Sequence, residues 1–197
     1  MNAAELEALW ELGVARFGEG EFPAALAALE RAAAADPDPD PEDLFVWAAA
    51  LERLGRIEEA DGALARAAAI APGEYVAPHR VDDGEFDAAV AAALTALPAP
   101  IRAALERDAT LIRDDFPSAA AVAAGQDPFL LGECLGELEL TRLGEAGPVE
   151  VYLYRRNLEK VCATREALIE EIRVTLYHEV GHALGLDEDG VEAFGLA

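Results

Sequence analysis

The sequence predicts a mostly helical α+β fold built from two parts. Residues 2 to about 73 repeat with a shift of 35 residues and have the pattern of paired amphipathic helices. Residues 149–154 alternate apolar and polar side chains and are rich in valine and tyrosine, which predicts a β-strand. A long helix-forming stretch near the C-terminus ends in the motif His178-Glu179-Val180-Gly181-His182. We therefore expect helical hairpins over residues 1–75 and an α+β domain with a small sheet over residues 82–197.

The N-terminal repeat is visible when the sequence is aligned with itself. Gly20 aligns with Gly55, and Leu29 with Leu64. The other aligned pairs are Leu9–Leu44, Gly13–Ala48, Phe22–Ile57, Ala25–Ala60, Ala32–Ala67 and Pro37–Pro72. Each copy predicts an amphipathic helix, a glycine turn, a second amphipathic helix and a closing proline. The small residues of the repeat occupy positions where two helices must approach closely.

This pattern resembles the tetratricopeptide repeat, whose period is 34 residues. The extra residue falls in the Asp-Pro run of residues 36–41, which is expected to be a stiff turn between the copies. The resemblance implies a concave groove that holds a peptide or a protein partner. A helical cap that only stabilises or dimerises the protein is the alternative. Two repeats are fewer than a solenoid usually needs, so they should lean on a further helical element or on the next domain.

A linker is expected over residues 72–82, which contain two prolines and a glycine. Beyond it the elements follow in a new order. We expect a helix over 86–98, a short helix over 100–106, a strand over 110–115, a Leu-Leu-Gly segment within 129–136 and a strand over 149–154.

The stretch before the histidine motif is expected to be helical. Thr164 can cap its first turn, and the following residues are good helix formers. Its apolar positions recur at helical spacing and predict a core-facing side: Leu168, Ile169, Ile172 and Leu176. Gly185 stands where a helix needs a left-handed residue after its end. The chain should therefore turn sharply after Leu184.

The motif itself predicts a zinc site. His178 and His182 lie one helical turn apart on one face, so both imidazoles can bind one Zn²⁺ at about 2.0–2.1 Å. Glu179 follows the first ligand and can accept a proton from the attacking water. The carboxylates of Asp187, Glu188 and Asp189 follow the turn, and one of them can return as a third ligand.

The order of these segments resembles the small bacterial zincin-like metallopeptidases. A helix ending in Leu-Pro, a Leu-Leu-Gly segment, a strand ending in Tyr-Arg-Arg and a terminal HExGH helix occur in that order over about residues 82–197. The resemblance implies a minimal zincin fold, with His178 and His182 as ligands and Glu179 as the catalytic residue. The family usually reads HExxHxxGxxD, but this chain has Glu188 at the last position. We expect Glu188 as the third ligand, with Asp187 as the alternative.

Further site roles follow from the same interpretation. Tyr177 and Tyr154 could stabilise an oxyanion, although packing in the core is the more common role of a buried tyrosine. The strand Val149–Tyr154 is the candidate to pair with an extended substrate peptide. The apolar C-terminal residues 191–197 could cover the cleft, or simply pack on the core.

Composition restricts the partners. The formal net charge is −24, from 39 acidic and 15 basic residues, which disfavours nucleic acid and anionic membrane surfaces. We expect no membrane span and no secretory signal, hence a cytoplasmic protein, with Cys134 and Cys162 reduced and structural.

Two functions from different classes remain open from the sequence. The first is a zinc-dependent metallopeptidase that hydrolyses peptide bonds in a peptide or protein substrate, with the repeats positioning that substrate or a protein partner. The alternative is a non-catalytic, zinc-stabilised scaffold or interaction protein. The presence of Glu179 favours the enzyme, because a structural zinc site does not need that residue.

Overall fold

The computed structural model describes residues 2–136, 138, 149–187 and 189–190. The chain forms two compact units. The first comprises Met1–Pro78 and Phe116–Phe129, and the second comprises His79–Asp115 and Leu130–Ala197. Helices dominate, and a small mixed sheet lies in the C-terminal region, so the predicted mostly helical α+β class is confirmed.

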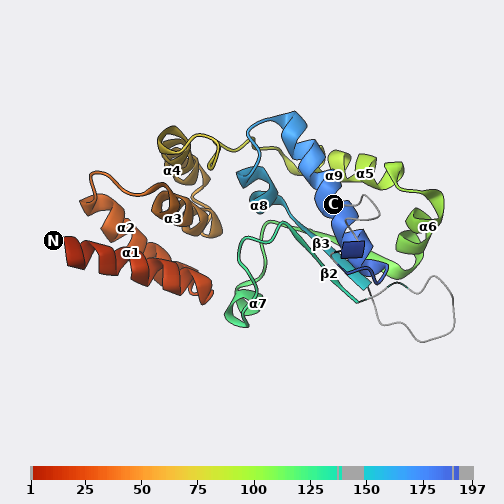
Figure 1. Ribbon diagram of the computed structural model, residues 1–197, viewed down its shortest axis with the longest axis horizontal. Coiled ribbons are helices and arrows are strands. Elements are labelled where there is room, and N and C mark those ends of the chain that lie inside the picture. Colours follow the sequence, from red (N-terminus) through yellow and green to blue (C-terminus); the bar gives the residue numbers. More distant parts are fainter. Residues whose placement is uncertain (1, 137, 139–148, 188, 191–197) are drawn as a thin grey trace. The chain divides into compact units, whose positions relative to one another are not determined.

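The first unit begins with two helix pairs (Figure 1). The helices are α1 (Ala3–Gly18), α2 (Phe22–Ala35), α3 (Pro41–Arg53) and α4 (Ile57–Ile70). Gly20 and Gly55 make the turns within the pairs at φ of 75° and 76°, a region that a side chain disfavours. The helix–glycine–helix pattern of the sequence therefore appears in both copies. Their likeness to tetratricopeptide repeats stays a prediction.

Close approach within the first pair explains one of the small residues. A Cβ atom added to Gly13 on α1 would lie 2.4 Å from the side chain of Leu29 on α2. Ala25 and Ala32 on α2 are fully buried in the same unit. Small residues at these positions let the two helices pack at short range, as the repeat pattern predicts.

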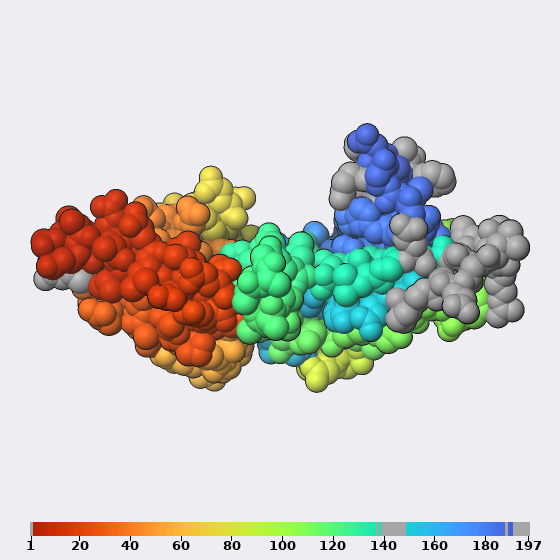
Figure 2. Space-filling view, turned by 90° about the horizontal axis from the view of Figure 1, so that it is seen from below, coloured from red at the N-terminus to blue at the C-terminus, as the bar shows by residue number. Residues whose placement is uncertain are grey.

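A segment from the middle of the chain completes the first unit. Residues 116–129 include the short helix α7 (Ala119–Ala123), whose surface adjoins that of the α1 end in Figure 2. Phe129 stacks on Phe17 with ring centroids 5.3 Å apart, and Arg53 donates a hydrogen bond of 3.1 Å to the carbonyl of Pro128. The limits read from the sequence, 1–75 and 82–197, place this segment in the second domain. In the structure it supplies packing surface to the two helix pairs.

The second unit combines helices with a three-stranded sheet. Its elements are α5 (Asp83–Ala96), α6 (Ala99–Asp108), β1 (Ala109–Asp114), β2 (Gly132–Leu135), β3 (Val149–Tyr154), α8 (Arg155–Lys160) and α9 (Arg165–Ala183). The sheet order is β1-β3-β2, with β1 parallel and β2 antiparallel to β3. The helix α9 packs against α5 and against β2 and β3 (Figure 1).

The strand β3 is central, and this corrects one prediction. Its residues pair with β1 on one side and with β2 on the other. Both edges of Val149–Tyr154 are therefore occupied, and the prediction that this strand pairs with a substrate peptide is wrong. The reason is that strong strand patterning reports burial, and burial is greatest in the middle of a sheet. Within the described residues, β2 has a neighbour on one side only.

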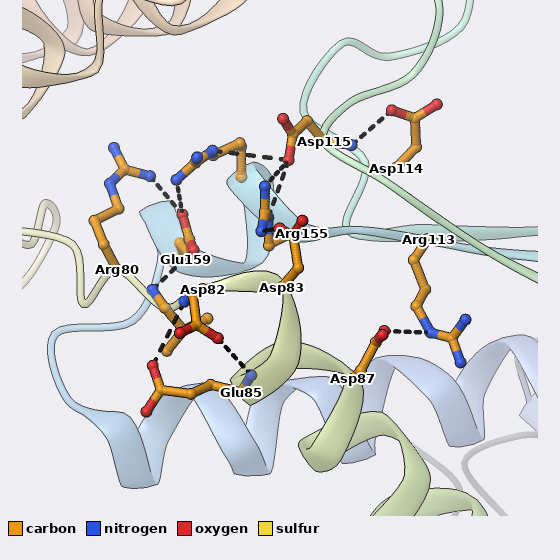
Figure 3. Close-up of polar contacts among 12 residues, drawn as sticks. Arg80, Asp82, Asp83, Glu85, Asp87, Arg113, Asp114, Asp115, Arg155 and Glu159 are labelled. Carbon is orange, nitrogen blue, oxygen red and sulfur yellow. Dashed lines mark hydrogen bonds and ion pairs between the residues drawn. The ribbon is translucent and has the colours of Figure 1, made fainter.

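A buried ion-pair cluster fixes α8, which leads into α9 (Figure 3). The carboxylate of Glu159 is fully buried and accepts hydrogen bonds from Arg80 at 2.9 Å, from Arg156 at 2.8 Å and from the backbone N–H of Val81 at 3.1 Å. Arg155 donates to Asp115 at 2.8 Å. The cluster thus joins the segment before α5 and the segment after β1 to the same short helix.

Cys134 and Cys162 are not joined by a disulfide. Burial, followed by the nearby charge of Glu171, raises the pKa of the Cys162 thiol to about 11, so this thiol stays protonated and unreactive near neutral pH. Among the helices of the described residues, none has the length and apolar character needed to cross a membrane.

Candidate functional site

The helix α9 forms the base of the site and is anchored at its start. The Thr164 hydroxyl accepts a hydrogen bond of 3.1 Å from the N–H of Ala167, which is the predicted N-cap. Three of the four predicted core residues, Leu168, Ile172 and Leu176, are buried, and the fourth, Ile169, is only partly buried. The apolar face holds the helix against the rest of the second unit.

The end of α9 has the predicted turn. Gly185 adopts φ of 78°, and its N–H donates to the carbonyl of His182 at 2.8 Å. The N–H of Leu186 donates to the carbonyl of Gly181 at 3.1 Å. These paired bonds form a Schellman motif, which reverses the chain directly after the second histidine.

The two histidines face each other across one helical turn. The Nε2 atoms of His178 and His182 are 3.0 Å apart, and the rings are nearly perpendicular at 81°. The Nδ1 atom of His182 lies 3.1 Å from the carbonyl oxygen of Leu186. A carbonyl can only accept, so Nδ1 of His182 carries the hydrogen, and the neutral ring then has its lone pair on Nε2. The Schellman turn that places Leu186 therefore also selects the tautomer of His182.

This arrangement fits a zinc ion. Two nitrogens bound to one tetrahedral zinc at about 2.0–2.1 Å lie slightly more than 3 Å apart. The observed Nε2–Nε2 separation is 3.0 Å. A ligating histidine also usually donates its other ring N–H to a carbonyl or carboxylate, as His182 does. The donor atoms of His178 and His182 thus converge as a metal requires.

Glu179 is held under the edge of the sheet. Its side chain is only 7% exposed, although it follows a half-buried histidine. A Cβ atom added to Gly132 on β2 would lie 3.0 Å from Cγ of Glu179 and 2.8 Å from Cγ2 of Thr175. Only a glycine leaves room for the glutamate at this crossing. Sequence reasoning did not assign Gly132 a role, although the Leu-Leu-Gly segment contained the signal.

An open pocket of about 500 Å³ lies beside the second histidine. It is lined by Cys134, Gly136, His182, Gly185, Leu186 and Asp187. Residues from β2 and from the turn after α9 therefore line the same pocket as one of the candidate metal ligands. This side of His182 therefore lies against an open pocket.

The third metal ligand stays a prediction. Glu188, the expected ligand, lies outside the described residues. Its alternative Asp187 lines the pocket, and its Oδ1 atom accepts a hydrogen bond of 2.9 Å from the N–H of Gly190. Within the described residues, no group of three or more histidine, cysteine or acidic side chains is arranged to hold a metal. The C-terminal residues 191–197, considered as a possible cover, also lie outside the described residues.

The two tyrosines considered as oxyanion donors are engaged elsewhere. The hydroxyl of Tyr177 donates to the carbonyl of Ala93 on α5 at 3.3 Å. The hydroxyl of Tyr154 donates a hydrogen bond to the carboxylate of Glu133. The pKa of the Tyr154 hydroxyl is raised above its usual range, mainly by burial and then by this hydrogen bond. These contacts favour the packing interpretation of both side chains.

A helix that carries two converging histidines, with a buried glutamate beside the first, is the arrangement that the HExxH motif predicts. Consistent with this, residues 107–196 match the family model of zincin-like metallopeptidases. The matched range starts within α6 and contains the candidate site residues His178, Glu179, His182, Asp187 and Glu188. The expected resemblance is confirmed over this range, which indicates a zinc peptidase-like domain. The range does not include the repeats. No curated protein matches the chain.

Proposed function

We propose that this protein is a zinc-dependent metallopeptidase that hydrolyses peptide bonds. The observation that carries the proposal is the convergence of the His178 and His182 Nε2 atoms at 3.0 Å, with Glu179 buried beside them. The family match over residues 107–196 supports the same activity. A packing role alone would require neither converging ring nitrogens nor a carboxylate held against the edge of the sheet.

The residues that would hold zinc are the two histidines and one carboxylate from the turn. We propose Glu188 for the carboxylate, with Asp187 as the alternative. When bound, zinc supplies a Lewis acid that lowers the pKa of a water to about 7 and polarises the substrate carbonyl.

Glu179 is the proposed general base. Its carboxylate would accept the proton of the attacking water and later return it to the leaving amine. Gly132 on β2 leaves room for Glu179, because a Cβ atom at this position would lie 3.0 Å from its Cγ. The side chain of Glu179 is 7% exposed, and this burial supports its role as a base that is held in place before substrate binds.

We place the substrate peptide along β2. Its far edge has no strand partner within the described residues, and Cys134 of this strand lines the pocket beside His182. An extended peptide could add to this edge by backbone hydrogen bonds, beside the pocket that Cys134 shares with His182. This assignment replaces β3, which has partners on both sides.

The helical repeats are proposed to position a protein substrate or partner for the peptidase. The alternative for the whole chain is a zinc-stabilised scaffold with little or no turnover, and the following measurement separates the two.

The test combines metal content with hydrolysis of an unstructured casein substrate. Wild-type protein and Glu179→Gln should each contain about one zinc per chain, whereas Glu179→Gln should lose activity by about 10²–10⁴-fold. Glu166→Gln is the matched control, since Glu166 is an exposed glutamate in the first turn of the same helix. Zinc in all three proteins without cleavage by any would favour the scaffold. Absence of bound metal would overturn the site.

A further inference from the structure

A groove of about 690 Å³ lies on the first unit, between α1 and the turn that leads into α3. Its floor is apolar and comes from α1, with Leu6, Trp10 and Val14 among its residues. Val14 is 41% exposed, so much of its side chain lies at the surface of the groove. The floor therefore offers apolar contact area to a bound molecule.

The floor and the rim of the groove are tied together. The indole Nε1 of Trp10 donates a hydrogen bond of 2.9 Å to Oδ2 of Asp36. The other oxygen of Asp36 accepts a hydrogen bond of 3.0 Å from the N–H of Asp38. One aspartate thus joins the helix α1 to the turn of residues 36–40.

The rim is stiff and regularly charged. Residues 36–41 alternate aspartate with proline, and Asp40 has φ of −64° and ψ of 147°, the polyproline II conformation. Proline fixes φ at alternate positions, so the chain loses little entropy when a ligand orders the rim further. Asp36, Asp38 and Asp40 are therefore presented in a preformed row.

The ionisable side chains known to line the groove are all acidic. Glu7 and Glu11 of α1 face the acids of the turn and of the start of α3. Burial, followed by the charges of Asp40, Glu42 and Asp36, raises the pKa of Asp43 to about 6. The negative charges thus act on one another, and no basic side chain is among the described residues that line the groove.

The shape of the acidic rim argues against two other occupants. The carboxylates do not converge, since no described group of three is arranged to hold a metal ion. A second copy of this chain would bring its own formal charge of −24 to the acidic rim, and charge repulsion would oppose it. An extended cationic partner satisfies both the spread of the charges and the apolar floor.

We propose that this groove binds a lysine- or arginine-rich segment of another protein, with apolar side chains of that segment seated on Leu6 and Val14. The inference gives the chemistry of the partner expected for the repeats, and it rests on that part of the proposed function. Binding is measured apart from hydrolysis, so failure of one is distinguishable from failure of the other.

The experiment uses the full chain carrying Glu179→Gln, so that the probe is not cleaved. A short labelled peptide alternating lysine with leucine should bind at physiological salt, as followed by fluorescence anisotropy. The same peptide with glutamine in place of lysine should bind much more weakly. Asp38→Asn with Glu42→Gln should weaken binding about fivefold, as expected for the loss of two charge contacts.

Matched controls test the location. Glu58→Gln with Glu74→Gln removes the same charge from exposed positions outside the groove, and Glu58 is the second residue of α4 as Glu42 is of α3. Binding should be unchanged in this control. Val14→Ser should weaken binding, whereas Leu12→Ser, at an equally exposed position of α1 outside the groove, should not.

Three results would overturn the proposal. The first is no binding of the lysine peptide by the folded chain. The second is an equal loss of affinity in the groove variant and its control, which would indicate attraction by net charge alone. The third is equal binding of the lysine and glutamine peptides.

Discussion

The two units of this protein bury different kinds of side chain. The first is packed mainly through alanine, leucine and aromatic residues of its helices, with Glu52 as the buried polar side chain of its described residues, and its groove leaves acidic side chains at the surface. The second buries several polar groups, including Glu159, Asn157 and Glu179. Buried polar groups are costly unless each one is bonded, so they are retained where geometry matters. The difference suggests a recognition surface in the first unit and a chemically specialised interior in the second.

The largest stability effect is expected in the second unit. Glu159→Gln removes the charge that Arg80 and Arg156 share in a buried position, and should lower the free energy of unfolding by about 3 kcal/mol. Both tryptophans, Trp10 and Trp47, belong to the first unit, so their fluorescence reports on that unit alone. In Glu159→Gln, circular dichroism should therefore detect unfolding at a lower urea concentration than tryptophan fluorescence does. An equal shift of both signals would mean that the units unfold together.

Substituting two glycines of the first unit by alanine should change the free energy of unfolding by less, and in opposite directions. Gly13→Ala places a methyl group against Leu29 and should cost about 1–3 kcal/mol. Gly62→Ala, within α4, meets nothing within 4 Å and should stabilise by about 0.5–1 kcal/mol through helix propensity. Tryptophan fluorescence in urea measures both. Equal effects would contradict the close approach of α1 and α2.

The smallest effect on stability is expected from removing one of the charges of the groove, at Asp43. The pKa of Asp43 is raised to about 6, first by burial and then by Asp40, Glu42 and Asp36. When the pKa of a carboxyl is higher in the folded than in the unfolded state, its protonation stabilises the folded state. This contribution is complete below the pKa of the unfolded state and is lost as the pH rises through about 6. Asp43→Asn should therefore raise the melting temperature at pH 7 and have little effect at pH 4. A similar change at both pH values would argue against the raised pKa of Asp43.

Local features of the chain were predictable because they depend on neighbouring residues. The Thr164 cap, the left-handed Gly185 and the glycine turns at Gly20 and Gly55 all follow from short-range geometry. The convergence of His178 and His182 follows from the helical period. For these features the sequence pattern and the structure agree.

Other features depend on residues that are distant in sequence. The central place of β3, the packing of residues 116–129 in the first unit and the fit of Glu179 under Gly132 each join segments from different parts of the chain. The periodicity of the sequence does not indicate which strand lies at the edge of the sheet, or which glycine lies where a strand crosses a helix. The proposed substrate edge is therefore β2 and not β3, whose two sides are both paired.

The sequence by itself determined the helical pairs, the long helix α9 and the pair of histidines on one of its faces, because backbone propensity and a fixed period decide these within a few residues. Only the tertiary structure decided that the sheet edge beside the candidate site belongs to β2 and that Glu179 is buried against it. It also decided that the acidic turn and α1 share one groove. These outcomes are set by packing between distant segments, which depends on shape and burial across the whole unit.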